Sequence, residues 1–232
     1  MATFRVALLI LFACFAPGCE DDGRPVPLAR QGVIDLASWD VERDGPVRLD
    51  GEWEFYWDRL LAPEDFVPGG QAGDMDGYLA FPGFWKGFVL GGQASLPAKD
   101  QALSLRDQEL SPRDQELPGT DSVLPGTGQA TFRLRILPGA SVRKWEMQLF
   151  SIPAAYKIWA NGWLIASSGM VGLGEEEESP DRSLVLAHFD SQGAPIDLVM
   201  QISNHYFFRG GVQNPILLAA PGQLEQAHAH TW

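Results

Sequence analysis

A two-residue alternation of apolar and polar side chains is the feature that most constrains the fold of this chain. In the segment 129–137, QATFRLRIL, apolar side chains occupy one parity and mostly polar ones the other: Ala130, Phe132, Leu134 and Ile136 against Thr131, Arg133 and Arg135. Successive side chains of a β-strand point to opposite faces, so this pattern predicts a strand with one buried and one wet face. The alternation recurs at 51–57, 144–150 and 197–204, and strands of this kind are typical of antiparallel sheets.

The remaining chain favours an all-β fold. The apolar runs 183–189 and 215–220 bring the expected total to about nine or ten strands, and no segment carries a long helical period. The 25 Gly and 17 Pro residues suit many short elements joined by tight turns. We therefore expect an all-β, antiparallel β-sandwich of the jelly-roll type. The segment 58–66, DRLLAPEDF, is expected to add one helical turn that Pro63 ends.

The dipeptide Asn161-Gly162 lies between two apolar runs in AAYKIWANGWLIASSG, residues 154–169. A two-residue hairpin loop of type I′ requires positive φ at both central positions, which Asn-Gly tolerates best. The sequence therefore predicts a hairpin here, and turn chemistry alone explains the Asn. Trp159 and Trp163 flank the turn, where they either pack across the strands or form an aromatic platform for a ligand.

Residues 91–127 depart from the strand pattern. They contain a seven-residue repeat: KDQALSL, RDQELSP, RDQELPG and TDSVLPG. A coiled coil needs two apolar positions per heptad, whereas only one recurs here, and Pro interrupts three of the four repeats. We expect a disordered insertion on a loop, with a partner-binding helix in the first two repeats as the alternative.

The N-terminus has the features of an export signal. Arg5 is followed by an apolar run from Val6 to Ala16, too short to span a bilayer but typical of a signal-peptide core. Of the two cysteines, Cys14 lies in this run and Cys19 directly after it, at the position of the lipidated cysteine in bacterial lipoproteins. We expect a signal peptide at 1–18, lipidation of Cys19 and a periplasmic or cell-surface location on a membrane. Ordinary cleavage with an incidental Cys19 remains the alternative, because Ala16 departs from the usual motif.

Charge and motifs exclude several classes of function. The formal net charge is -13, whereas nucleic-acid binding requires a basic surface, so we expect no nucleic-acid partner. Nucleophile-elbow, zinc-protease and phosphate-loop motifs are missing from the sequence, and we expect no enzymatic activity and no cofactor.

Six motifs occur in an order that resembles a known family: LDGEWEFYWDRLL, FPGFWKG, GQATFRLRILP, AYKIWANGWLIASSGMVG, QISNHYFFRGG and NPILL. Together they resemble the extracytoplasmic jelly-roll sensor domain of bacterial seven-transmembrane receptors with diverse intracellular signalling modules. They are also similar to the sugar-binding domain of family 2 glycoside hydrolases. The resemblance implies a galactose-binding-like jelly roll over 32–220. The polar, Pro-bearing segment 19–31 is expected to be a tether, and 221–232 a tail.

The function implied by this resemblance is non-catalytic ligand binding. We expect a carbohydrate-binding sensor module of a signalling receptor, or a free-standing lipoprotein version of it. The receptors continue into membrane helices and an output domain, which this sequence does not show. The alternatives are a protein-interaction module that modulates a membrane receptor, and a truncated receptor fragment.

Five residues are candidates for ligand contact. Trp85 and Lys86 lie in FPGFWKG, where an indole stacks on a sugar ring and an ammonium donates to its hydroxyls. Asn204, His205 and Arg209 lie in SNHYFFRGG, at the end of a predicted strand, where sandwiches display binding groups. In the competing interpretation, Trp85 packs in the core, Asn204 caps a turn and Arg209 forms a surface ion pair.

We expect no metal site. The run of four Glu at 175–178 suggests calcium, but consecutive loop side chains scatter, so a solvated loop is the simpler interpretation. His228 and His230 lie in the tail, where terminal residues usually fray.

Overall fold

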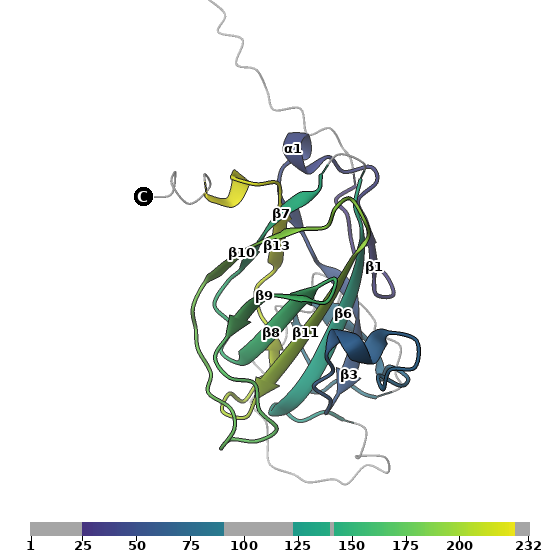
Figure 1. Cartoon of the computed structure of the whole chain (residues 1–232). Helices are drawn as coiled ribbons and strands as arrows, with labels where there is room; N and C mark the ends of the chain where they lie inside the picture. The colour runs from purple at the N-terminus through teal and green to yellow at the C-terminus, as the bar shows by residue number, and fades with distance from the viewer. Residues whose placement is uncertain (1–24, 91–122, 140–141, 226–232) are drawn as a thin grey trace, which may run out of the picture.

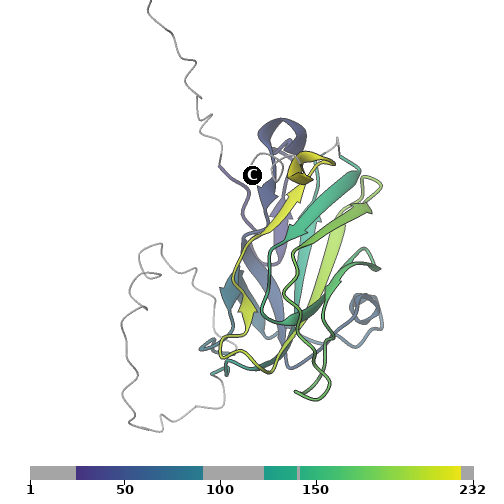
Figure 2. The same cartoon turned by 90° about the vertical axis from the view of Figure 1, so that its left-hand side faces the viewer.

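The alternating segments pair into two sheets that stack face to face in a computed structural model, which describes residues 25–90, 123–139 and 142–225 (Figures 1 and 2). The larger sheet has seven strands in the order β4-β3-β6-β11-β8-β9, with β1 pairing the far end of β6 in parallel. Its strands are β1 (Val33–Asp35), β3 (Gly51–Trp57), β4 (Gly77–Phe81), β6 (Gly128–Leu137), β8 (Ala155–Ala160), β9 (Trp163–Ser168) and β11 (Ile196–Asn204).

The second sheet has four antiparallel strands in the order β10-β7-β13-β2. They are β2 (Val47–Arg48), β7 (Lys144–Leu149), β10 (Val185–Asp190) and β13 (Ile216–Ala219). A two-stranded ribbon is made by β5 (Gly83–Phe84) and β12 (Gly211–Val212). Two short helices are α1 (Val41–Asp44) and the 3-10 helix η1 (Pro63–Phe66), and a further helical turn is formed by residues 223–225 at the end of the described chain. The expected all-β antiparallel sandwich is therefore confirmed, and among the named strands of the described residues only β1 pairs in parallel.

The core lies between the two sheets. It is filled by the apolar side chains at the alternate strand positions that the sequence pattern predicts to be buried. Phe132 and Leu134 of β6 and Met200 of β11 are buried from one side, and Trp145 and Met147 of β7 from the other. Burying side chains of this size is worth about 1.5–3 kcal/mol each. Side chains from both sheets therefore fill a single apolar core.

The hairpin is confirmed at the predicted dipeptide. Asn161 and Gly162 both have positive φ, 49° and 85°, and Ala160 pairs with Trp163 across the turn. The Asn161 side chain also accepts a hydrogen bond from the backbone N–H of Asp197 at 2.7 Å. The turn residue therefore ties the hairpin to the end of β11, which is a structural role.

The predicted position of one helical turn is wrong. The helical turn in the segment 58–66 begins at Pro63 instead of ending there. The fixed φ of proline suits the first position of a helix, where its missing N–H has no partner to lose. The N–H of Ala62 donates to the carboxylate of Asp65 at 2.8 Å, which closes the turn.

The tether and the repeat insertion both have ends that pack on the sandwich. Ala29 is fully buried and exchanges backbone hydrogen bonds with Asp50 and Glu52, so packing starts before the expected boundary at Gly32. Leu124, from the fourth repeat, is also buried and bonds with the backbone of Gly87 and Phe88. The rest of the insertion, residues 91–122, lies outside the described residues, as do the signal segment with Cys19 and the tail with His228 and His230.

Candidate ligand-binding site

Two segments that are far apart in the sequence meet at one end of the sandwich. In the β5–β12 ribbon, Phe84 pairs with Gly211, and the N–H of Trp85 donates to the carbonyl of Gly210 at 3.0 Å. This pairing brings the motifs FPGFWKG and SNHYFFRGG side by side. The five predicted contact residues therefore lie in one region, but their side chains have different surroundings.

Trp85 belongs to the core. Its side chain is 0% exposed and packs edge-on against Trp57, with ring centroids 5.6 Å apart. Gly210 lies against the indole so closely that an added Cβ would overlap Cε2 and Cζ2. Only the absence of a side chain at Gly210 permits this packing. The prediction that Trp85 stacks on a ligand is corrected here, since the buried indole does not reach the surface.

Asn204 caps a turn. Its side chain is 1% exposed, and its amide nitrogen donates to the carbonyls of Gly126 and Phe207 at 3.0 and 2.6 Å. Its amide oxygen accepts the N–H of Phe207 at 3.0 Å. With both donors used inside the protein, the side chain holds the loop 204–207 to the end of the repeat insertion. Asn204 therefore holds this loop in place, and its side-chain donors are already used within the protein.

His205 joins two loops. Its backbone N–H donates to the Glu178 carboxylate at 2.6 Å, and its ring nitrogen Nε2 lies 3.2 Å from the carbonyl oxygen of Gly172. The hydroxyl of Tyr206 donates to the carbonyl of Glu175 at 2.6 Å. These contacts fix the acidic loop against the loop 204–210.

Glu178 departs from the expectation of a solvated acidic run. It is 5% exposed, and its Oε1 atom has no partner within the part of the chain that the structure describes. Burial raises the pKa of the Glu178 carboxyl, because a charged carboxylate is poorly solvated there, while the N–H of His205 partly opposes this effect. The Glu177 carboxylate instead accepts the N–H of Leu173 at 3.1 Å, so these two neighbouring carboxylates have different partners.

Lys86 and Arg209 remain exposed and share an aromatic ring. The Lys86 ammonium lies 5.8 Å from the centroid of the Phe208 ring, and the Arg209 guanidinium lies 5.2 Å from the same centroid. Arg209 also lies 5.7 Å from the centroid of Phe84. We call Phe84, Lys86, Phe208 and Arg209 the cation–aromatic cluster.

The chemistry of this cluster suits a ligand with both apolar and anionic or hydroxyl groups. Phe84 and Phe208 are 36% and 58% exposed, although they are large apolar residues. Neither cation has a carboxylate within ion-pair distance among the described residues. Ring faces attract C–H groups and cations, whereas ammonium and guanidinium groups donate hydrogen bonds to oxygen.

Sequence reasoning missed the two phenylalanines of the cluster. A signal was present, because FPGFWKG and YFFRGG each combine an aromatic residue, a cation and a glycine within a few positions. Trp is the more usual stacking group, which drew attention away from Phe84 and Phe208, and the long-range pairing of the two motifs is not visible in the sequence.

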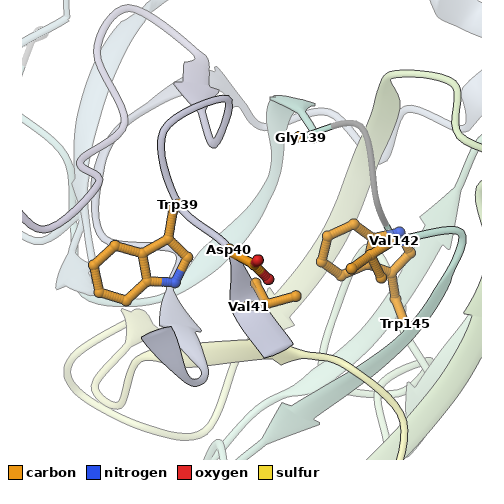
Figure 3. A pocket seen from close by; sticks show the side chains of 6 residues that line it. All are labelled: Trp39, Asp40, Val41, Gly139, Val142 and Trp145. Carbon is orange, nitrogen blue, oxygen red and sulfur yellow. The ribbon is translucent and has the colours of Figure 1, made fainter. Parts of the chain in front are cut away.

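A small hollow lies elsewhere in the molecule, where α1 meets the end of β7 (Figure 3). It is lined by Trp39, Asp40, Val41, Gly139, Val142 and Trp145. It has room for about one water molecule, so it is too small for a sugar ring.

Of the helices in the described ranges, none has the length and apolar character needed to span a bilayer.

A scan against models of protein families finds no match for this chain, and a search of curated proteins finds none either. Solved structures do match. A β-glucuronidase of Faecalibacterium prausnitzii aligns with 76% of this chain and 31% of its own length, at 14% identity and a TM-score of 0.46. A β-glucuronidase of Ruminococcus gnavus aligns with 76% of this chain and 29% of its own, at 15% identity and a TM-score of 0.45. A family 2 β-galacturonidase of Eisenbergiella tayi, bound to galacturonate, aligns over 76% and 24%, at 11% identity and a TM-score of 0.43. This chain thus spans less than a third of each of these proteins.

Proposed function

We propose that this chain is a non-catalytic carbohydrate-binding module, exported and held at a bacterial membrane, that acts as a sensor. The observation that carries the binding proposal is the cation–aromatic cluster. In a chain with a formal charge of -13, two cations lie around one exposed ring without carboxylate partners among the described residues. Aromatic surface beside hydrogen-bond donors is suited to the C–H and hydroxyl groups of a sugar.

The two cations further favour a saccharide that carries negative charge. An exposed guanidinium binds a carboxylate through two parallel hydrogen bonds, and an ammonium adds a point charge. Binding should then weaken as salt is added, because exposed charges are screened at high ionic strength. A neutral sugar would show little salt dependence.

The binding proposal is tested on a glycan array with the full mature chain, followed by calorimetric titration of the best saccharide. Arg209→Ala is expected to weaken binding by about tenfold or more, since hydrogen bonds to charged groups are worth about 1.5–3 kcal/mol. Phe208→Ala removes a ring face and is expected to weaken binding by up to about tenfold, since aromatic contacts are worth about 0.5–1.5 kcal/mol. Arg182→Ala is the matched control, because Arg182 is an exposed arginine on another loop. Equal affinity of the Arg209 and Arg182 variants would contradict the proposed site.

The location at a membrane rests on the N-terminal sequence, with Val6 to Ala16 as the signal core and Cys19 as the lipidated residue. Mass spectrometry of the mature N-terminus tests it. A diacylglyceryl-modified Cys19 supports the anchor, and an unmodified Cys19 excludes it.

A second function, protein interaction through the repeat insertion, is favoured by one observation. The insertion leaves and rejoins the sandwich beside the cluster: Val89 pairs with Val123, and a Cβ at Gly126 would lie 3.4 Å from Lys86. A variant in which a short Gly-Ser linker replaces 91–122 separates the two functions. Glycan binding that survives the deletion supports the carbohydrate site, whereas loss of a membrane-protein partner alone supports the insertion.

A further inference from the structure

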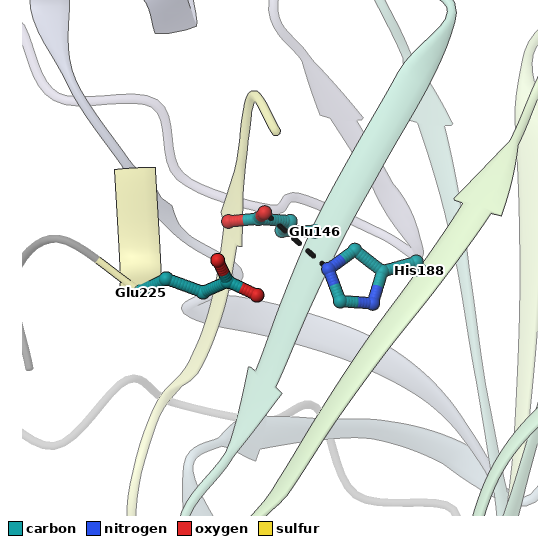
Figure 4. A group of neighbouring side chains, drawn as sticks. All are labelled: Glu146, His188 and Glu225. Atoms are coloured by element: carbon teal, nitrogen blue, oxygen red, sulfur yellow. Dashed lines mark ion pairs between the residues drawn. The ribbon is translucent and has the colours of Figure 1, made fainter. Parts of the chain in front are cut away.

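A second cluster of polar groups lies on the outer face of the smaller sheet, away from the cation–aromatic cluster. Glu146 of β7 and His188 of β10 are direct cross-strand partners, and Glu225 comes from the last described turn (Figure 4). One ligand atom from each residue can be chosen so that all three lie within 4.8 Å of one another. We propose that Glu146, His188 and Glu225 bind a divalent transition-metal ion of the Zn²⁺ type.

The Glu146 carboxylate is fixed in place before any ion binds. Its side chain is only 2% exposed, although it points to the face of the sheet opposite the core. The N–H groups of Gly222 and Leu224 both donate to it, the latter at 3.2 Å. Ligating carboxylates in metal sites are typically oriented by such hydrogen bonds, and each oxygen retains a second lone pair.

The His188 ring is directed at the same carboxylate. Its Nε2 atom lies 3.3 Å from Oε1 of Glu146. Ligand bonds of about 2.0–2.2 Å in a tetrahedral zinc site place neighbouring ligand atoms about 3.3 Å apart. The observed separation therefore accommodates an ion between the two groups with small movements of the exposed imidazole.

The third group is a second carboxylate, and its position favours a cation. Glu225 is exposed, yet Figure 4 shows its carboxylate turned toward Glu146. Two carboxylates repel each other at this distance, whereas a divalent ion neutralises both. A set of imidazole and carboxylate ligands suits Zn²⁺ and leaves a fourth position for water. An ion here would join the turn at 221–225 to the sheet face.

Metal binding is tested on the full mature chain after treatment with a chelator. Calorimetric titration with Zn²⁺ is expected to show one site, and Co²⁺ is expected to give the intense visible absorption of a tetrahedral complex. His188→Gln and Glu225→Gln should each lower the affinity by at least about tenfold, because even loss of an outer partner of a ligand lowers affinity 10–100-fold. Zn²⁺ should raise the midpoint of thermal unfolding of the parent chain but not of these variants.

A double variant, His228→Ala with His230→Ala, is the control, since it removes two other imidazoles and leaves the three proposed ligands. It is expected to bind as the parent does. The inference is overturned if the parent binds neither Zn²⁺ nor Co²⁺. It is also overturned if the two ligand variants bind as the parent does while the double variant does not.

Discussion

The packing of Gly210 on Trp85 gives a prediction that joins the fold to the candidate site. In Gly210→Ala the new Cβ would lie 2.5 Å from Nε1 of the Trp85 indole and still closer to two of its carbons. The φ of Gly210 is not positive, so the backbone itself tolerates alanine, and the whole effect arises from packing. Because Trp85 is 0% exposed, its ring is enclosed by other residues, and moving it would displace the core around it.

Overpacking a close-packed core typically destabilises by 1–3 kcal/mol, and overlap with several ring atoms places this case at about 2–3 kcal/mol. For a domain of this size, that loss lowers the midpoint of thermal unfolding by about 4–12 °C. Thermal and urea unfolding of the purified chain measure it. The substitution should also weaken ligand binding, because Gly210 directly follows Arg209 in the cation–aromatic cluster.

Two further variants separate this clash from a general effect of alanine. Gly174→Ala is the control, because its Cβ would meet nothing within 4 Å, and it is expected to change stability by less than about 0.5 kcal/mol. In a Trp85→Leu background the clash is removed, so Gly210→Ala should become milder by about 1–2 kcal/mol. If Gly210→Ala and Gly174→Ala unfold at the same midpoint, the reasoning is refuted.

Three other variants have expected outcomes. The pKa of Glu178 is raised in the folded state, so its contribution to stability is fully present below the unfolded pKa of about 4.3 and is lost as pH rises through the folded pKa. Urea unfolding between pH 4 and 8 should therefore show that Glu178→Gln gains stability relative to the parent as pH increases. A relative gain toward acid pH would contradict this. Asn161→Ala loses the hydrogen bond to Asp197 and places alanine at a positive φ, so the free energy of unfolding should fall by about 1–2 kcal/mol. Asn161→Gly should lose less stability, because glycine adopts a positive φ readily. The reverse order would refute the turn assignment. Leu124→Ala removes a buried side chain at the end of the insertion and should cost about 2–3 kcal/mol in urea unfolding, whereas no change would show that 123–127 is not anchored.

The sequence predicts best what local periodicity determines. The parity of 129–137 and of 144–150 assigns Phe132, Met147 and their neighbours to the core correctly, because side chains of a strand must alternate. The hairpin at Asn161-Gly162 is predicted for the same local reason, since few dipeptides tolerate two positive φ angles.

Residues whose surroundings depend on distant pairing are predicted poorly. Trp85 resembles an exposed loop residue until β5 pairs with β12 and Gly210 covers its ring. Glu146 lies on the polar parity of its strand but is buried, because backbone N–H groups at Gly222 and Leu224 reach it from the far end of the chain. The same distant pairing brings Lys86 and Arg209 together, which their sequence positions do not show.

The most direct test of carbohydrate binding at the cation–aromatic cluster is chemical-shift mapping. The isotope-labelled mature chain is titrated with the saccharide that binds best on the array, and backbone amide shifts are followed. The largest saturating changes are predicted at Phe84, Lys86, Phe208 and Arg209, and they should disappear in Arg209→Ala. Changes concentrated at Trp159 and Trp163 instead, with the cluster unaffected, would contradict the account.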